Sequence, residues 1–278
     1  MKMEESLKKL KELADKGFEI HDGDYVGDDG LLYCGKCHTR RQTRLTLSDG
    51  QVFEPLCMCK CEEARLEQEE QERKQRERLY KIQSYKRSGF PDDELRSCTF
   101  ERDDTPESKA SKVCHNYVDN FNAFRQKGKG LMLFGDVGTG KTFLASCIAN
   151  ALIDEMHPCL VTNFSRIINT LSGMFEGKQQ YIDRLNDYEV LIIDDLATER
   201  KTEYVNEIVY SIIDSRYRSG KPLIITTNFS PMDMQNEQDI NRRRIYSRIG
   251  EMCIPVEVKG KDRRKAMPDG DLLKLLFK

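Results

Sequence analysis

Long apolar runs are missing from this sequence of 278 residues. No stretch reaches the roughly 18 consecutive apolar residues that a membrane-spanning helix requires, so we expect no membrane contact. Residues 1–17 are charged throughout and lack the apolar core of a secretory leader, which favours a cytoplasmic protein. The formal net charge of −2 does not attract nucleic acid as a whole, so any DNA contact must come from a local basic patch.

Internal repeats and low-complexity tracts are also missing, and the charged stretch over residues 62–88 has too few apolar positions for a coiled-coil seam. Glutamates lead basic residues by four positions there, as in Glu70 and Lys74, which is typical of an exposed helix. We therefore expect a solvated linker helix over 62–91. A further helix is expected over 4–16, where it either packs on its own domain or binds a partner.

From about residue 92 onward, short apolar segments alternate with amphipathic helical segments. Strands are predicted at 131–134, 159–162, 190–193, 223–227 and 253–258. Between two of them, Val205, Ile208, Val209 and Ile212 repeat at helical spacing. This alternation predicts an α/β fold with a parallel five-stranded sheet between helices.

The loop after the first predicted strand matches the phosphate-binding pattern G-x-x-x-x-G-K-[ST] at every fixed position. Its residues are Gly135, Asp136, Val137, Gly138, Thr139, Gly140, Lys141 and Thr142, followed by Phe143. The glycines permit a tight loop whose N–H groups turn inward, and the helix that starts there adds its positive end. Lys141 is expected to reach the phosphates of ATP or ADP, and Thr142 to offer its hydroxyl to Mg²⁺. A merely structural turn is the alternative, which the strand–loop–helix context disfavours.

Two carboxylates, Asp194 and Asp195, end the apolar strand at 190–193. In open α/β sheets the ligand binds at the carboxyl ends of the strands, so this segment fits a Walker B element. Asp194 is then expected to hold Mg²⁺ together with Thr142. The alternative is an ordinary aspartate pair that caps the next loop.

Five of the ten cysteines lie between positions 34 and 61. In a reducing cytoplasm, clustered cysteines bind metal more often than they form disulfides. Structural zinc takes four ligands: Cys34 and Cys37 form a knuckle, and we expect Cys57 and Cys59 to complete the site, with Cys61 as the alternative. A redox pair of Cys34 and Cys37 is the other interpretation, but no thioredoxin-like unit surrounds it.

The order of these elements resembles the DnaC/DnaI helicase loaders of the AAA+ superfamily and their relatives, including the transposition ATPase IstB. The resemblance rests on the phosphate-binding loop and on the segments 194–199, 226–228, 245–249 and 260–264. It covers about residues 90–266, and the cysteine cluster is similar to that of DnaI-like members. It implies an N-terminal zinc-binding, helicase-interacting domain over 1–61, the linker helix, and an AAA+ ATPase domain over 92–278 without a separate lid domain.

The resemblance also implies roles for two residues that follow the strands. Asn228 corresponds to the polar sensor that orients the attacking water, the alternative being a turn-favouring asparagine. Asp195 stands where the family usually carries a water-activating glutamate and is one methylene shorter. That difference implies slow hydrolysis that a partner stimulates.

Arginines near the C-terminal end of the sequence resemble those that contact nucleotide in the family. Arg248 corresponds to the arginine finger for a neighbouring subunit's nucleotide, with Arg244 as the second choice. Arg264 corresponds to the second sensor, with Arg263 as a substitute because the usual tyrosine is missing. These residues also make the region locally basic, which allows contact with single-stranded DNA.

The function implied by the resemblance is ATP-dependent loading of a hexameric replicative helicase onto single-stranded DNA in replication initiation. The loader is expected to form a homo-oligomer when it is ATP-bound on the helicase. Two alternatives stay open: an IstB-like transposition helper ATPase, and an adaptor that binds nucleotide without turnover.

Overall fold

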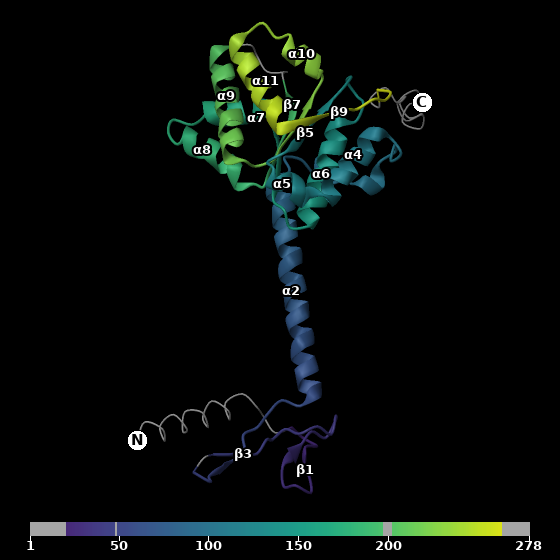
Figure 1. Cartoon of the computed structure of the whole chain (residues 1–278), viewed down its shortest axis with the longest axis vertical. Helices are drawn as coiled ribbons and strands as arrows, with labels where there is room; N and C mark the ends of the chain where they lie inside the picture. Colours follow the sequence, from purple (N-terminus) through teal and green to yellow (C-terminus); the bar gives the residue numbers. More distant parts are fainter. Residues whose placement is uncertain (1–20, 48, 197–201, 263–278) are drawn as a thin grey trace, which may run out of the picture. The chain divides into compact units, whose positions relative to one another are not determined.

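The computed structural model describes residues 21–47, 49–196 and 202–262. The helix expected over 4–16 lies outside these residues. The chain divides into two compact units between Leu79 and Tyr80. One helix, α2 (Lys60–Gly89), begins in the first unit and ends in the second (Figure 1).

The first unit contains two short antiparallel strand pairs. Strand β1 (Tyr25–Val26) pairs with β2 (Leu32–Tyr33), and β3 (Leu45–Thr46) pairs with β4 (Val52–Phe53).

A buried charge cluster holds this first unit together. The Arg41 side chain is only 1% exposed and lies 3.1 Å from a carboxylate oxygen of Asp24 and 3.4 Å from one of Glu62. Removing one partner would leave a buried charge uncompensated, so the cluster fixes the start of α2 against the strand region.

The second unit is built on the predicted five-stranded parallel sheet, in the order β6-β7-β8-β5-β9. The strands are β5 (Gly130–Phe134), β6 (Cys159–Asn163), β7 (Val190–Leu196), β8 (Leu223–Thr227) and β9 (Cys253–Glu257). The predicted fold class is confirmed. Because all five strands are parallel, the residues that follow β5, β7 and β8 meet at one edge of the sheet.

Apolar side chains of the sheet alternate between two cores. Val190 and Ile192 point into one core, while Leu191 and Ile193 point into the other. Near-continuous apolar strands are expected where helices cover both faces.

Helices cover both faces of the sheet (Figure 1). Helices α4 (Lys109–Asp119) and α6 (Lys141–Asp154) pack on one face, and α7 (Phe164–Ser172), α9 (Glu203–Ser219) and α11 (Ile240–Met252) pack on the other. Shorter helices are α3 (Asp93–Arg96), α5 (Phe121–Gln126), α8 (Lys178–Arg184) and α10 (Pro231–Gln235), with 3₁₀ turns at Phe100–Arg102 and Leu185–Asp187. Across the described ranges, none of the helices has the length and apolar character needed to cross a bilayer.

Candidate functional site

The phosphate-binding loop connects β5 to α6 and depends on glycine at three positions. Gly135, Gly138 and Gly140 have φ angles of 147°, 79° and 98°, a region that side-chain-bearing residues rarely adopt. Space is also short, because a Cβ atom at Gly135 would lie 2.4 Å from the carbonyl oxygen of Val258. The sequence thus folds this loop against the segment that follows β9.

Lys141 is the first residue of α6, and its side chain turns back into the loop. The residue is 7% exposed, and its ammonium group donates hydrogen bonds of 2.8 Å to the Gly135 carbonyl and 2.6 Å to the Asp136 carbonyl. The charge therefore already lies inside the loop, where a phosphate would bind. Thr139 supports the same loop, because its hydroxyl donates to the Asp136 carbonyl at 2.9 Å.

Asp194 joins the ends of three elements. Its Oδ1 atom accepts a 2.8 Å hydrogen bond from the Thr142 hydroxyl and a 2.5 Å hydrogen bond from the Thr226 hydroxyl. A hydroxyl and a carboxylate on adjacent elements form an oxygen donor set of the kind that Mg²⁺ prefers. Thr142 and Asp194, both predicted as magnesium ligands, are therefore brought together. Thr226 was missed, although it lies beside Asn228 at the end of an apolar strand.

Asp195 has a left-handed backbone with a φ of 61°, in a bulge between β7 and β8. Such a conformation costs on the order of 1–2 kcal/mol outside glycine, although aspartate tolerates it better than most residues. The Asp195 N–H donates to the Thr226 hydroxyl at 2.9 Å, which holds the bulge in place. Strained residues of this kind are concentrated at functional sites.

A pocket of about 550 Å³ unites these residues. Its lining consists of Glu94, Leu95, Cys98, Val137, Gly138, Gly140, Lys141, Thr142, Phe143, Asp194, Asp195 and Asn228. Most of the expected nucleotide-contacting residues thus meet in one cavity, and Asn228, the residue after β8, joins them. The three residues from the segment 94–98 were not predicted. The expected second sensor, Arg264, and its substitute Arg263 lie outside the described residues.

Arg248 does not line this pocket. It lies on α11, where its guanidinium is 2.5 Å from an Asp214 carboxylate oxygen and 4.5 Å from the centre of the Tyr210 ring, both on α9. The expected arginine finger is thus engaged within its own subunit. Arg244, one turn earlier on α11, is exposed beside Tyr210 and Glu203.

A cluster of four cysteines lies in the first unit. The sulfur atoms of Cys34, Cys37, Cys59 and Cys61 all lie within 4.8 Å of one another. Cys61 Sγ is 3.5 Å from Cys34 Sγ and 3.3 Å from Cys59 Sγ, near the ~3.8 Å edge of a tetrahedron with zinc–sulfur bonds of about 2.3 Å. The donor set therefore fits zinc.

Hydrogen bonds within the cluster shift the pKa values of its thiols in opposite directions. The backbone N–H groups of Cys37 and Lys36 lower the pKa of the Cys34 thiol, and the Thr39 hydroxyl and N–H lower that of Cys37 to about 5. Hydrogen bonds to its neighbours, first of all Cys59, raise the pKa of Cys61 to about 12. A zinc ion bound here would be held by all four sulfurs as thiolates.

Cys61 takes the place in this cluster that was expected for Cys57. Cys57 lies in an extended segment, its N–H donating to the Arg41 carbonyl at 2.7 Å and its sulfur lying 3.6 Å from the Arg40 carbonyl oxygen. Helix α2 begins at Lys60, and its first turn brings the sulfur of Cys61 back to Cys59 and Cys34. The predicted ligand set is therefore corrected at one position.

Comparisons with known proteins identify a family and several relatives of this chain. The family profile of the bacterial DnaA ATPase domain matches residues 107–251, slightly more than half of the chain. The replicative helicase loader DnaI of Bacillus subtilis is 24% identical over 198 residues, which cover 66% of this chain and 64% of the relative. The replicative helicase loader DnaC of Buchnera aphidicola is 26% identical over 160 residues, covering 54% of this chain and 64% of the relative.

Among solved structures, the crystal structure of DnaI superposes with a TM-score of 0.53 and 25% identity, over 63% of this chain and 95% of that chain. The chain thus spans slightly less than two thirds of the length of the curated loaders that it matches.

Proposed function

The chain belongs to the bacterial DnaA ATPase domain family of AAA+ proteins and resembles the DnaC/DnaI-type helicase loaders, and we propose that it loads a hexameric replicative helicase onto single-stranded DNA in an ATP-dependent step. The observation that carries the proposal is the single pocket that unites the phosphate-binding loop, Asp194 and Asn228. A loader needs a nucleotide switch, and these residues form one.

In the proposed mechanism, ATP binds with its phosphates in the loop. Lys141 leaves the carbonyls of Gly135 and Asp136 for the β- and γ-phosphates. Thr142 and Asp194 would hold a magnesium ion. A magnesium ion held by these two side chains would neutralise phosphate charge.

Asp195 and Asn228 flank the same pocket and are proposed to orient the attacking water. The Asp195 carboxylate reaches less far than a glutamate, so turnover is proposed to be slow without the helicase.

The arginine finger is proposed to come from α11 of a neighbouring copy, in a homo-oligomer that forms on the helicase. Arg248 would first have to leave Asp214 and the ring of Tyr210, whereas Arg244 is exposed and needs no such rearrangement. We therefore propose Arg244 as the residue that contacts the neighbour's nucleotide.

Alanine variants separate the two arginines. Arg244→Ala should reduce helicase-stimulated ATP turnover by at least ~100-fold without changing thermal stability. Arg248→Ala should destabilise the domain by about 1–3 kcal/mol, because it removes a half-buried ion pair and a ring contact. Arg243→Ala is the control, since it removes an exposed arginine from the same helix. Lost turnover with unchanged stability in Arg248→Ala would instead make Arg248 the finger.

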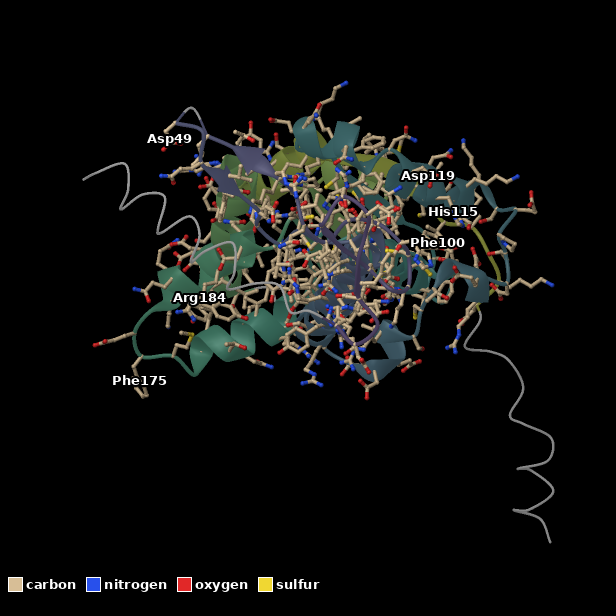
Figure 2. All side chains as sticks on the ribbon, turned by 90° about the horizontal axis from the view of Figure 1, so that it is seen from below. Asp49, Phe100, His115, Asp119, Phe175 and Arg184 are labelled. Carbon is tan, nitrogen blue, oxygen red and sulfur yellow. The ribbon has the colours of Figure 1, made fainter. Side chains whose placement is uncertain are left out.

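The second unit also offers a side chain suited to single-stranded DNA. Phe175 is fully exposed in the loop between α7 and α8, and Figure 2 shows it pointing away from the neighbouring helices. Exposed aromatic rings stack on bases without sequence preference. We propose that this loop contacts the DNA strand.

We also propose that the four-cysteine cluster of the first unit holds zinc, and that the first unit contacts the helicase.

A loading assay tests the proposed function. Circular single-stranded DNA has no end for a helicase ring to thread, so loading requires ring opening or assembly. With the helicase of the same source, this protein and ATP should place helicase on the circles and start unwinding of an annealed strand. ADP should not support the reaction. Unwinding that is equal with and without this protein would exclude the loader function.

A further inference from the structure

The nucleotide pocket has a second wall, formed by Glu94, Leu95 and Cys98 ahead of α4. This wall offers a carboxylate, an apolar side chain and a thiol, and no cation. A carboxylate repels triphosphate, so the wall suits the uncharged base and ribose, while the loop suits the phosphates.

The wall is held in part by the Leu95 side chain, which packs against the core that contains α6. Helix α3 (Asp93–Arg96) has four residues, none of them buried. The last carbonyl groups of a helix lack partners within the helix and need donors from elsewhere. The Leu95 carbonyl accepts one hydrogen bond from the Cys98 N–H at 3.2 Å, and further donors must come from outside α3.

Asn150 provides those donors from α6. It is 2% exposed, and its Nδ2 group lies 3.2 Å from the Leu95 carbonyl oxygen, 2.7 Å from that of Cys98 and 3.1 Å from that of Ser146. The buried Asn150 amide thus connects Leu95 and Cys98 of the wall to α6, the helix that begins with Lys141.

Building on the ATP binding proposed above, we propose that Asn150 is a positioning residue that holds the base-side wall at a fixed distance from the phosphate-binding loop. Asn150 lies about two and a half turns along α6 from Lys141. Loss of its amide releases the wall but leaves the loop, Lys141 and Thr142 intact. Affinity for a complete nucleotide then falls, while affinity for the phosphate chain alone does not.

Calorimetric titration with two ligands tests this role. ATP contains a base and ribose, and inorganic tripolyphosphate contains only the phosphate chain. Asn150→Ala and the shape-matched Asn150→Asp should each weaken ATP binding about tenfold, since the Cys98 carbonyl loses the Asn150 amide as a donor and the Leu95 carbonyl keeps only its backbone donor. Tripolyphosphate binding should change less than about twofold.

Ser146→Ala is the matched control. Ser146 lies one turn earlier on α6, is fully buried, and its hydroxyl has no hydrogen-bond partner among the residues that the structure describes. This variant should bind both ligands like the wild type, although it also alters a buried polar group of α6.

Two outcomes would overturn the role of Asn150. One is an equal loss of affinity for ATP and for tripolyphosphate, which would indicate damage to α6. The other is an unchanged affinity for ATP. Failure of the wild type to bind ATP would instead contradict the proposed function.

If the Asn150 variants do not fold, the wild-type protein provides a second test. Cys98 is labelled with iodoacetamide, and the extent of labelling is measured by peptide mass spectrometry. ATP should protect Cys98 and tripolyphosphate should not. Equal protection by both ligands, or none by ATP, would overturn the base-side wall that Asn150 is proposed to hold.

Discussion

Replacing Lys141 with alanine should abolish measurable ATP binding. The Lys141 ammonium group is almost fully buried in the loop, where it already donates two short hydrogen bonds. Hydrogen bonds to charged groups contribute about 1.5–3 kcal/mol each, so the loss of two to phosphate corresponds to a ~10²–10⁴-fold weaker affinity. Titration calorimetry with ATP and Mg²⁺ measures this loss.

Lys112→Ala is the matched control for Lys141→Ala. Lys112 lies on α4, is exposed, pairs with Glu107 at 2.6 Å, and does not line the pocket. Its replacement should leave ATP affinity within about twofold of the wild type, because exposed ion pairs contribute little. ATP binding of normal strength by folded Lys141→Ala would show that the loop does not bind phosphate.

Replacing Cys61 with serine should remove zinc from the first unit. Structural zinc contributes about 10–16 kcal/mol of apparent binding free energy in small metal-dependent modules, which is folding free energy for such a module. The variant should therefore lose its metal and become sensitive to protease over residues 21–59. Metal content per chain and limited proteolysis measure the two effects.

Cys57→Ser provides the comparison, since Cys57 lies in the same segment outside the four-sulfur cluster. It should keep one zinc ion per chain. ATP affinity should be unchanged in both variants, because the pocket lies within the second unit. The reverse result, with zinc lost from Cys57→Ser and kept by Cys61→Ser, would restore the ligand set expected from the sequence.

The sequence was sufficient for the sheet and for the phosphate-binding loop. Both depend on local patterns: runs of apolar residues at strand length, and glycines whose backbone angles few other residues adopt. The magnesium pair could also be anticipated, because parallel strands bring their carboxyl ends together and so place Asp194 near Thr142.

Features that depend on contacts between distant segments were not predictable. The bulge at Asp195 depends on the Thr226 hydroxyl of the neighbouring strand. The choice of Cys61 over Cys57 depends on the start of α2 at Lys60, because its first turn brings the Cys61 sulfur back to Cys59 and Cys34.

The same limit applies to Asn150 and Arg248. Asn150 lies in the mainly apolar helix α6, and its contact with Cys98 joins residues 52 positions apart. The engagement of Arg248 depends on Asp214 of another helix. Helical spacing in the sequence predicts that both residues lie on helices, but it does not predict which residues they contact.

The most direct test of the loader function is the complex with the replicative helicase of the same source, measured by size-exclusion chromatography with light scattering in ATP and in ADP. We expect a stable complex in ATP that contains several copies of this chain per helicase hexamer and weakens in ADP. If the protein binds ATP and retains zinc but forms no complex with the helicase in either nucleotide, the loader function is contradicted.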